Sequence, residues 1–157
     1  MPFCVMDSPV GRLRIAEEDG CLTRIDRTTE AAAPPNTPLL EEAVRQLIAY
    51  FDGSLTDFDL PLKVSGTAFQ EQCWAALQEI PYGTTVSYGE QARRIGKPKA
   101  SRAVGGANHH NPIMIVIPCH RVVGASGSLT GYGGGLDMKA WLLQHERAVL
   151  EAKNHHA

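Results

Sequence analysis

The sequence has little that would suit a membrane, secreted or disulfide-bonded protein. No apolar run approaches the length of a membrane span, and no basic segment followed by an apolar one opens the chain. We therefore expect neither a transmembrane helix nor a signal peptide. The 4 cysteines include no C-x-x-C pair, which weakens a zinc or thioredoxin-type interpretation. Reduced thiols and a cytoplasmic location are the expectation.

Acidic residues are missing from one long window. None occurs between Glu90 and Asp137, although the whole chain carries a net charge of −2. The window does hold basic residues and histidines: Arg93, Arg94, Lys97, Lys99, Arg102, Arg121, His109, His110 and His120. Such a window favours one face built for a polyanion, while a solvated basic surface is the plainer alternative.

The first part of the chain is typical of a small antiparallel sheet followed by a helix. Short strands are predicted over 3–6, 12–17 and 22–26, separated by turn residues, and an amphipathic helix over 38–51. The irregular stretch 54–66 is the best candidate for a domain boundary. We therefore expect two domains, 1–65 and 66–157, within a length of 157 residues.

The second part is predicted to be mostly helical. Helices are expected over 67–79, 87–95, 99–108 and 136–148, and Ser87-x-x-Glu90 forms a capping box. Two short helices across the break at 96–98 are typical of a helix-turn-helix. The fold class is therefore α/β in the α+β sense.

The second helix of this pair has almost no side-chain bulk. It contains Ala100, Ala103, Gly105, Gly106 and Ala107. Glycine is costly in a helix, so its presence indicates a close approach by another group. Tight helix packing would explain it, as would insertion into a narrow space such as the DNA minor groove, with Arg102 projecting.

The most informative stretch is 111–122. A β-branched apolar run, expected to form a short buried strand or extended segment, ends at Pro118 and is followed by Cys119, His120 and Arg121. A thiolate forms more readily beside a histidine or arginine, so Cys119 could be a nucleophile. Free cysteines are also often buried and inert, and this stretch alone does not distinguish the two.

The sequence Pro118-Cys119-His120-Arg121-Val122, preceded by Asn111-Pro112, resembles the acceptor-cysteine signature of the O6-alkylguanine-DNA alkyltransferases. Strong resemblance covers about 66–147. Further matching segments fall in the family's order and spacing: Phe69-Gln70, Cys73-Trp74, Ile80-Pro81-Tyr82-Gly83-Thr84, Ser87-Tyr88-Gly89, Arg102-Ala103-Val104-Gly105, Gly131-Tyr132, Gly134-Gly135-Leu136 and Lys139-x-Trp141-Leu142-Leu143-x-x-Glu146.

The resemblance implies a small N-terminal α/β support domain and a winged-helix-like C-terminal domain whose helix-turn-helix enters the minor groove of double-stranded DNA. It implies base flipping of O6-methylguanine, with O4-methylthymine as a second candidate, and one irreversible alkyl transfer to Cys119. No metal or organic cofactor and no membrane would be needed, and the protein would act as a monomer.

The resemblance also assigns roles to individual residues. His120 would take the thiol proton and Glu146 would orient the imidazole, as in a catalytic triad. Tyr88 would crowd the phosphate 3′ to the target and donate a proton to the leaving guanine. Asn111 would brace the backbone, and Lys139 would help electrostatically.

DNA contacts and pocket walls follow from the same resemblance. Arg102 would fill the space that the flipped base leaves. The other implied DNA-binding residues are Tyr88, Arg121, Lys99, Ala103 and Gly105, and the implied pocket residues are Val122, Tyr132, Gly133 and Gly134. Gly133 replaces a serine of some members. Cys4 and Cys21 occupy two zinc-ligand positions of some members, but no useful histidine follows, so we predict no structural zinc.

Two other functions remain as alternatives. One is a damage-binding protein of the same fold that flips the lesion without removing it, although such relatives replace the acceptor cysteine, which is present here. The other is a Cys-His-Glu hydrolase unrelated to DNA, which leaves the basic window and the helix-turn-helix unexplained.

Overall fold

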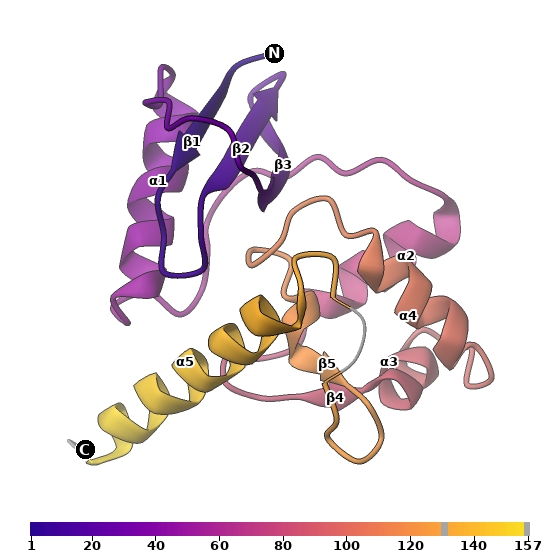
Figure 1. Ribbon diagram of the computed structural model, residues 1–157. Helices are drawn as coiled ribbons and strands as arrows, with labels where there is room; N and C mark the ends of the chain where they lie inside the picture. The colour runs from indigo at the N-terminus through magenta and orange to yellow at the C-terminus, as the bar shows by residue number, and fades with distance from the viewer. Residues whose placement is uncertain (130–131, 156–157) are drawn as a thin grey trace. The chain divides into compact units, whose positions relative to one another are not determined.

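The computed structural model describes residues 1–129 and 132–155. The chain forms two compact units (Figure 1). The first comprises Met1–Val64 together with Pro112–Met114, and the second comprises Ser65–Asn111 and the described residues from Ile115 onward. Gly131, part of one of the motifs above, lies outside the described residues.

The first unit is a three-stranded antiparallel sheet covered by one helix. The strands β1 (Phe3–Met6), β2 (Leu13–Glu18) and β3 (Cys21–Arg27) lie in sequence order. The register between β2 and β3 shifts at Ala16/Glu17. The three predicted strands are confirmed, with ends that differ by one residue at most positions, as hydrogen-bond assignments commonly do.

The helix α1 (Pro38–Phe51) packs against this sheet, with the predicted bounds. It begins there because the Thr37 side chain accepts a hydrogen bond from Leu40 N–H, and proline suits the first turn. Its buried face, spaced at three to four residues, completes the core of this unit: Leu40, Ala43, Leu47 and Tyr50.

The apolar run before Pro118 is buried, but it does not form the extended strand that its residues favour. Ile113 forms an isolated bridge to Ile25 of β3, and the chain then turns. Ile115 has a φ of 73°, a left-handed conformation that is unusual for a β-branched residue. This conformation breaks the alternation of a strand, and it costs about 1–3 kcal/mol, which the surrounding packing must offset.

The second unit contains the remaining elements. They are α2 (Ala68–Leu77), β4 (Val86–Ser87), α3 (Tyr88–Arg94), α4 (Ser101–His109), a 3₁₀ turn η1 (Cys119–Arg121), β5 (Val122–Val123) and α5 (Leu136–His155). The four predicted helices and the α+β class are confirmed. The parallel pair β4–β5 is not predictable from the sequence, because two residues are too few to show a period.

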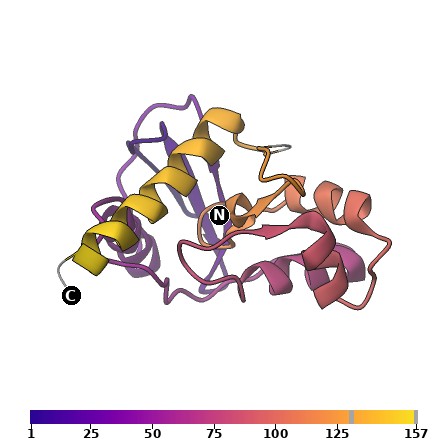
Figure 2. The ribbon, with the colours of Figure 1, turned by 90° about the horizontal axis from the view of Figure 1, so that it is seen from below.

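The β4–β5 pair lies between two groups of helices. Figures 1 and 2 show α3 and α4 on one side of it and α5 on the other. Helix α5 continues to His155, beyond the expected end near residue 148. Neither glycine nor proline follows Ala148, and the residues there favour helix, which explains the extension. Among the described helices, none has the length and apolarity to cross a membrane.

Candidate functional site

The helix-turn-helix consists of α3, the turn at Gly96 and α4. Gly96 adopts a φ of 78°, which a residue with a side chain rarely does, so the glycine permits the tight break. Lys99, Arg102 and Ala103 are exposed around the start of α4, while Val104 is buried. The structure therefore presents three of the expected DNA-binding residues together on a solvent-accessible surface.

Tyr88, at the start of α3, lies between groups from α4 and α5. A Cβ atom added at Gly105 would lie 3.6 Å from Tyr88 Cε1, so the ring packs directly on the α4 backbone. On the other side, Lys139 Nζ donates a hydrogen bond of 3.4 Å to the Tyr88 hydroxyl. Lys139 is fully buried, which makes this cation an unusual feature that requires compensation.

Cys119 opens the η1 turn and is 5% exposed. Asn111 Nδ2 donates to Cys119 Sγ at 3.2 Å and to Ile117 O at 2.7 Å, so one amide ties the sulfur to the preceding backbone. Burial raises the pKa of the Cys119 thiol to about 11, although the Asn111 hydrogen bond and the Lys139 charge act in the opposite direction. The resting sulfur is therefore a thiol, and forming the thiolate requires a base.

His120 and Glu146 form a buried pair. His120 Nε2 lies 2.6 Å from Glu146 Oε2, and the two side chains are 0% and 1% exposed. Since the carboxylate accepts a hydrogen bond from Nε2–H, the lone pair of the imidazole is on Nδ1. Nδ1 is buried and has no partner among the described protein groups, so it is the nitrogen left to accept a proton.

Arg121 differs from its expected placement. Its guanidinium donates to Glu146 Oε1 from Nε at 2.8 Å, to Glu146 Oε2 from Nη2 at 3.0 Å and to Ile80 O from Nη1 at 2.7 Å. Only 7% of the residue is exposed. The prediction of Arg121 at the DNA-binding surface is therefore wrong, because the structure places it inside the protein as the partner of Glu146.

The pKa values of the pair follow from these contacts. Burial lowers the pKa of His120 and outweighs the hydrogen bond and charge of Glu146, which raise it, while the positive charges of Arg121 and Lys139 act in the same direction as burial. Burial alone would raise the pKa of Glu146, but the hydrogen bonds and charges of His120 and Arg121 hold it well below its usual range. The site therefore pairs a neutral imidazole with an ionised carboxylate, as a general base and its orienting group require.

Glu146 has a further partner that sequence reasoning missed. Gly83 N–H donates to Glu146 Oε1 at 3.0 Å, across 63 positions of the chain. Together with the Arg121 contact to Ile80 O, it connects α5, η1 and the turn after α2. The family motif around Tyr82-Gly83 is the only feature of the sequence that points to this turn. The hydrogen bond itself could not be predicted, because every residue except proline has a backbone N–H.

The expected pocket residues differ in how far they are exposed to solvent. Val122 is fully buried and Tyr132 is 6% exposed, whereas Gly133 is exposed and Gly134 is half-buried. In the described ranges, no group of three or more His, Cys, Asp or Glu side chains is arranged to hold a metal ion.

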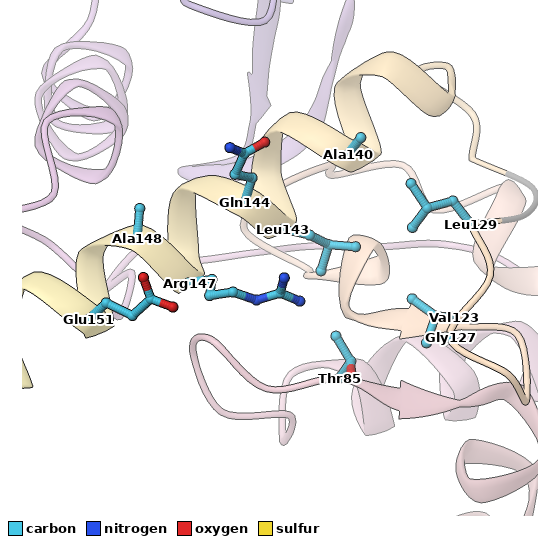
Figure 3. A pocket seen from close by; sticks show the side chains of 10 residues that line it. All are labelled: Thr85, Val123, Gly127, Leu129, Ala140, Leu143, Gln144, Arg147, Ala148 and Glu151. Atoms are coloured by element: carbon cyan, nitrogen blue, oxygen red, sulfur yellow. The ribbon is translucent and has the colours of Figure 1, made fainter.

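A separate groove of about 510 Å³ lies between α5 and the β4–β5 region (Figure 3). Thr85, Val123, Leu143 and Arg147 are among its lining residues. Among the described residues that line it, none is a predicted site residue, so this groove is not the site at Cys119.

Two family models match the chain. Residues 68–148 match the DNA binding domain of 6-O-methylguanine DNA methyltransferase. Residues 2–64 match the ribonuclease-like domain of the same family. The two matches together leave out only the short connection after residue 64 and the residues at either end.

Individual relatives agree with these models. The methylated-DNA–protein-cysteine methyltransferase of Mycolicibacterium paratuberculosis is 55% identical over 151 residues, covering 92% of each chain. The crystal structure of the Mycobacterium tuberculosis O6-methylguanine methyltransferase matches with a TM-score of 0.86 at 49% identity, covering 94% of this chain and 93% of that one. A structure of Mycobacterium tuberculosis OGT in complex with DNA gives a TM-score of 0.87 at 49% identity, with the same coverage.

Proposed function

The chain belongs to the 6-O-methylguanine DNA methyltransferase family, and we propose that it repairs DNA by transferring an alkyl group from O6 of guanine to its own Cys119. The relatives are named methylated-DNA–protein-cysteine methyltransferases, and one structural relative is a complex with DNA. One observation carries the proposal. The buried Cys119 sulfur accepts a hydrogen bond from Asn111, and His120, the next residue, is oriented by Glu146.

The choice of Cys119 among the cysteines rests on its surroundings. Cys4 and Cys73 are also buried, and burial raises the pKa of each thiol. Cys119 alone among the described cysteines combines a side-chain hydrogen bond to its sulfur, a neighbouring buried histidine and an opposing positive charge. These groups assist thiolate formation, which burial alone opposes.

The transfer is a single displacement. His120 Nδ1 accepts the thiol proton through a bridging water, since none of the described protein groups lies within hydrogen-bond distance of Nδ1, and the ionised Glu146 stabilises the imidazolium that forms. The Cys119 sulfur donates an electron pair to the alkyl carbon while the bond from that carbon to the guanine oxygen breaks. The guanine keeps the bonding pair and takes a proton. The thioether product cannot return to a thiol, so each chain acts once.

Tyr88 is the proposed donor of the proton to the leaving guanine. Its hydroxyl accepts a hydrogen bond from the buried Lys139 Nζ, which holds the phenol oxygen in place and puts a cation beside it. Lys139 therefore supports the same proton transfer without touching the DNA.

We further propose that α4 enters the minor groove of double-stranded DNA. Arg102 would occupy the space of the flipped base, and Lys99 would contact phosphates. Ala103 and Gly105 would allow the helix backbone a close approach to the duplex. Flipping brings the lesion to Cys119, at a cost of a few kcal/mol.

The remaining assignments follow the same proposal. Val122, Tyr132, Gly133 and Gly134 would wall the pocket for the extruded guanine, with O4-methylthymine as a second substrate. Residues 1–65 would support the DNA-binding and acceptor part, 66–157. The protein would work as a cytoplasmic monomer without a cofactor.

The test is the intact mass of the protein after incubation with duplex DNA that carries one O6-methylguanine. We expect the wild type to gain one methyl group per chain and then stop, and Cys119→Ala to gain none. Tight lesion binding without a mass change would instead indicate a damage-binding protein. Neither binding nor transfer would leave the hydrolase as the better hypothesis.

A further inference from the structure

Helix α4 carries Arg102 and buries two apolar side chains of its own. These are Val104 and Ala107, which pack with Cys73 of α2 and Ala92 of α3, while the partly buried Phe69, Tyr88 and Ile95 pack against the same cluster. Its N-cap, Ala100, makes no side-chain capping bond. Apolar contact is non-directional, so by itself it does not select one register or rotation of a helix.

A buried pair of side-chain amides, by contrast, makes directional hydrogen bonds that restrict the position and rotation of α4. Gln91 of α3 and Asn108 of α4 exchange hydrogen bonds: Gln91 Nε2 donates to Asn108 Oδ1 at 3.1 Å, and Asn108 Nδ2 donates to Gln91 Oε1 at 2.7 Å. Gln91 Nε2 also donates to Cys73 O of α2 at 3.2 Å. The two residues are 1% and 4% exposed, so solvent cannot replace either partner at little cost.

The residue next to Asn108 is fixed in the same way. Trp74 Nε1 of α2 donates to Ala107 O at 2.9 Å, in a buried hydrogen bond. Two consecutive residues near the end of α4 are thus hydrogen-bonded to α2 and α3. A rotation or shift of α4 that re-aimed Arg102 would break the amide pair, because such bonds need a narrow range of distance and angle.

We propose that the Gln91–Asn108 pair is a positioning device that fixes the register of α4 and thereby aims Arg102 into the duplex. This inference rests on the proposed function, since it concerns the step in which the lesion leaves the stack. Neither residue touches the reacting atoms. Asn108 O also accepts a hydrogen bond of 3.2 Å from the N–H of Asn111, which holds the Cys119 sulfur, so the test must separate an effect on α4 from an effect on the acceptor site.

The experiment compares two alkyl donors. One is duplex DNA carrying O6-methylguanine, and the other is O6-methylguanine supplied as the free base at high concentration. Rates of Cys119 alkylation are followed by intact mass for the wild type, Gln91→Leu and the exchanged variant Gln91→Asn/Asn108→Gln. The exchanged variant keeps the summed length of the two side chains and can restore the reciprocal bond.

Gln46 of α1 provides a matched control. It is likewise buried, at 4% exposure, and exchanges hydrogen bonds of 2.9 Å and 2.9 Å with the backbone of Asp59. Gln46→Leu therefore breaks a comparable buried amide far along the chain from α4. Melting temperatures of all variants separate a general loss of stability from a loss of positioning.

For Gln91→Leu we expect the duplex rate to fall on the order of tenfold or more, as small misplacements of reacting groups do, with the free-base rate within about twofold of the wild type. The exchanged variant should recover part of the duplex rate, and Gln46→Leu should leave the ratio of the two rates unchanged. An unchanged ratio of the two rates in Gln91→Leu, whether both rates fall equally or neither falls, would overturn the inference. No alkylation of the wild type by the duplex would instead overturn the proposed function.

Discussion

Arg121 and Glu146 are joined by two parallel hydrogen bonds, from Nε to Oε1 at 2.8 Å and from Nη2 to Oε2 at 3.0 Å. The same carboxylate lies 2.6 Å from His120 Nε2. The bidentate arginine explains how Glu146 stays ionised in a buried position while the imidazole beside it stays neutral. The proposed base, His120, therefore shares its carboxylate partner with Arg121.

Replacing Arg121 by methionine should destabilise the protein strongly, because it leaves the buried Glu146 charge without its bidentate cationic partner. We expect a decrease of about 3–5 kcal/mol in the free energy of unfolding, measured by urea denaturation. Arg24→Met is the control, since Arg24 and Asp26 form an exposed pair whose removal should cost no more than about 1 kcal/mol. Similar decreases for both variants would contradict the role of Arg121.

Glu146→Gln should slow alkyl transfer more than it weakens DNA binding. The amide can still lie beside His120, but it cannot stabilise an imidazolium by charge. We expect the single-turnover rate to fall about a hundredfold or more, while the affinity for undamaged duplex DNA stays near that of the wild type. A rate close to the wild type would exclude His120 as the base that Glu146 supports.

The buried His120 should make stability depend on pH. Its pKa is lowered in the folded protein from the ordinary value of 6.5, so below about pH 6.5 the unfolded chain binds a proton that the folded chain does not. Stability from this group is present above that pH and is lost as the pH falls. The measurement is the free energy of unfolding from about pH 7.5 to about pH 5.

The contribution of His120 is isolated by comparing variants in that pH series. His120→Asn should flatten the decline in stability below about pH 6.5 relative to the wild type. His109→Asn, which replaces an exposed histidine, should keep the wild-type slope. Identical slopes for all three proteins would show that His120 is not responsible.

Arg102→Ala should reduce repair of the lesion more than it reduces general DNA affinity. The side chain is exposed at the second position of α4, where the proposed finger role requires it. Lys97→Ala, at an exposed cation of the preceding turn, should weaken affinity without a specific decrease in transfer rate. Parallel decreases of affinity and transfer in Arg102→Ala would argue against a finger.

The affinity for DNA should decline steeply with salt. The cations between Glu90 and Asp137 are exposed apart from Arg121, so they can displace counterions from phosphates. A plot of log affinity against log salt concentration should have a clearly negative slope. Lys99→Ala should make that slope shallower by about 0.9 if Lys99 neutralises one phosphate. An affinity independent of salt would remove the case for a DNA-facing basic surface.

Most helices and strands could be predicted from the sequence, because the residues that start and end them act on their immediate neighbours. Proline and threonine at the start of α1, the Ser87 N-cap of α3 and the glycine break at Gly96 act on neighbouring residues, so their elements form where expected. The additional turns of α5 could not be predicted, because a helix without a stop signal ends where packing and fraying decide.

Residue types also predicted a nucleophile, a base and a carboxylate, since the spacing of Cys119, His120 and Glu146 matches a known family, and the fold places His120 Nε2 2.6 Å from Glu146 Oε2. Sequence could not decide where Arg121 points. In an exposed position it would be a phosphate ligand, and only the fold, which brings α5 and η1 together, makes it the partner of Glu146. The long-range hydrogen bonds of Gly83 with Glu146 and of Gln91 with Asn108 likewise depend on tertiary packing. Their donors and acceptors are common to many residues and become specific only when the fold brings them within about 3 Å of one another.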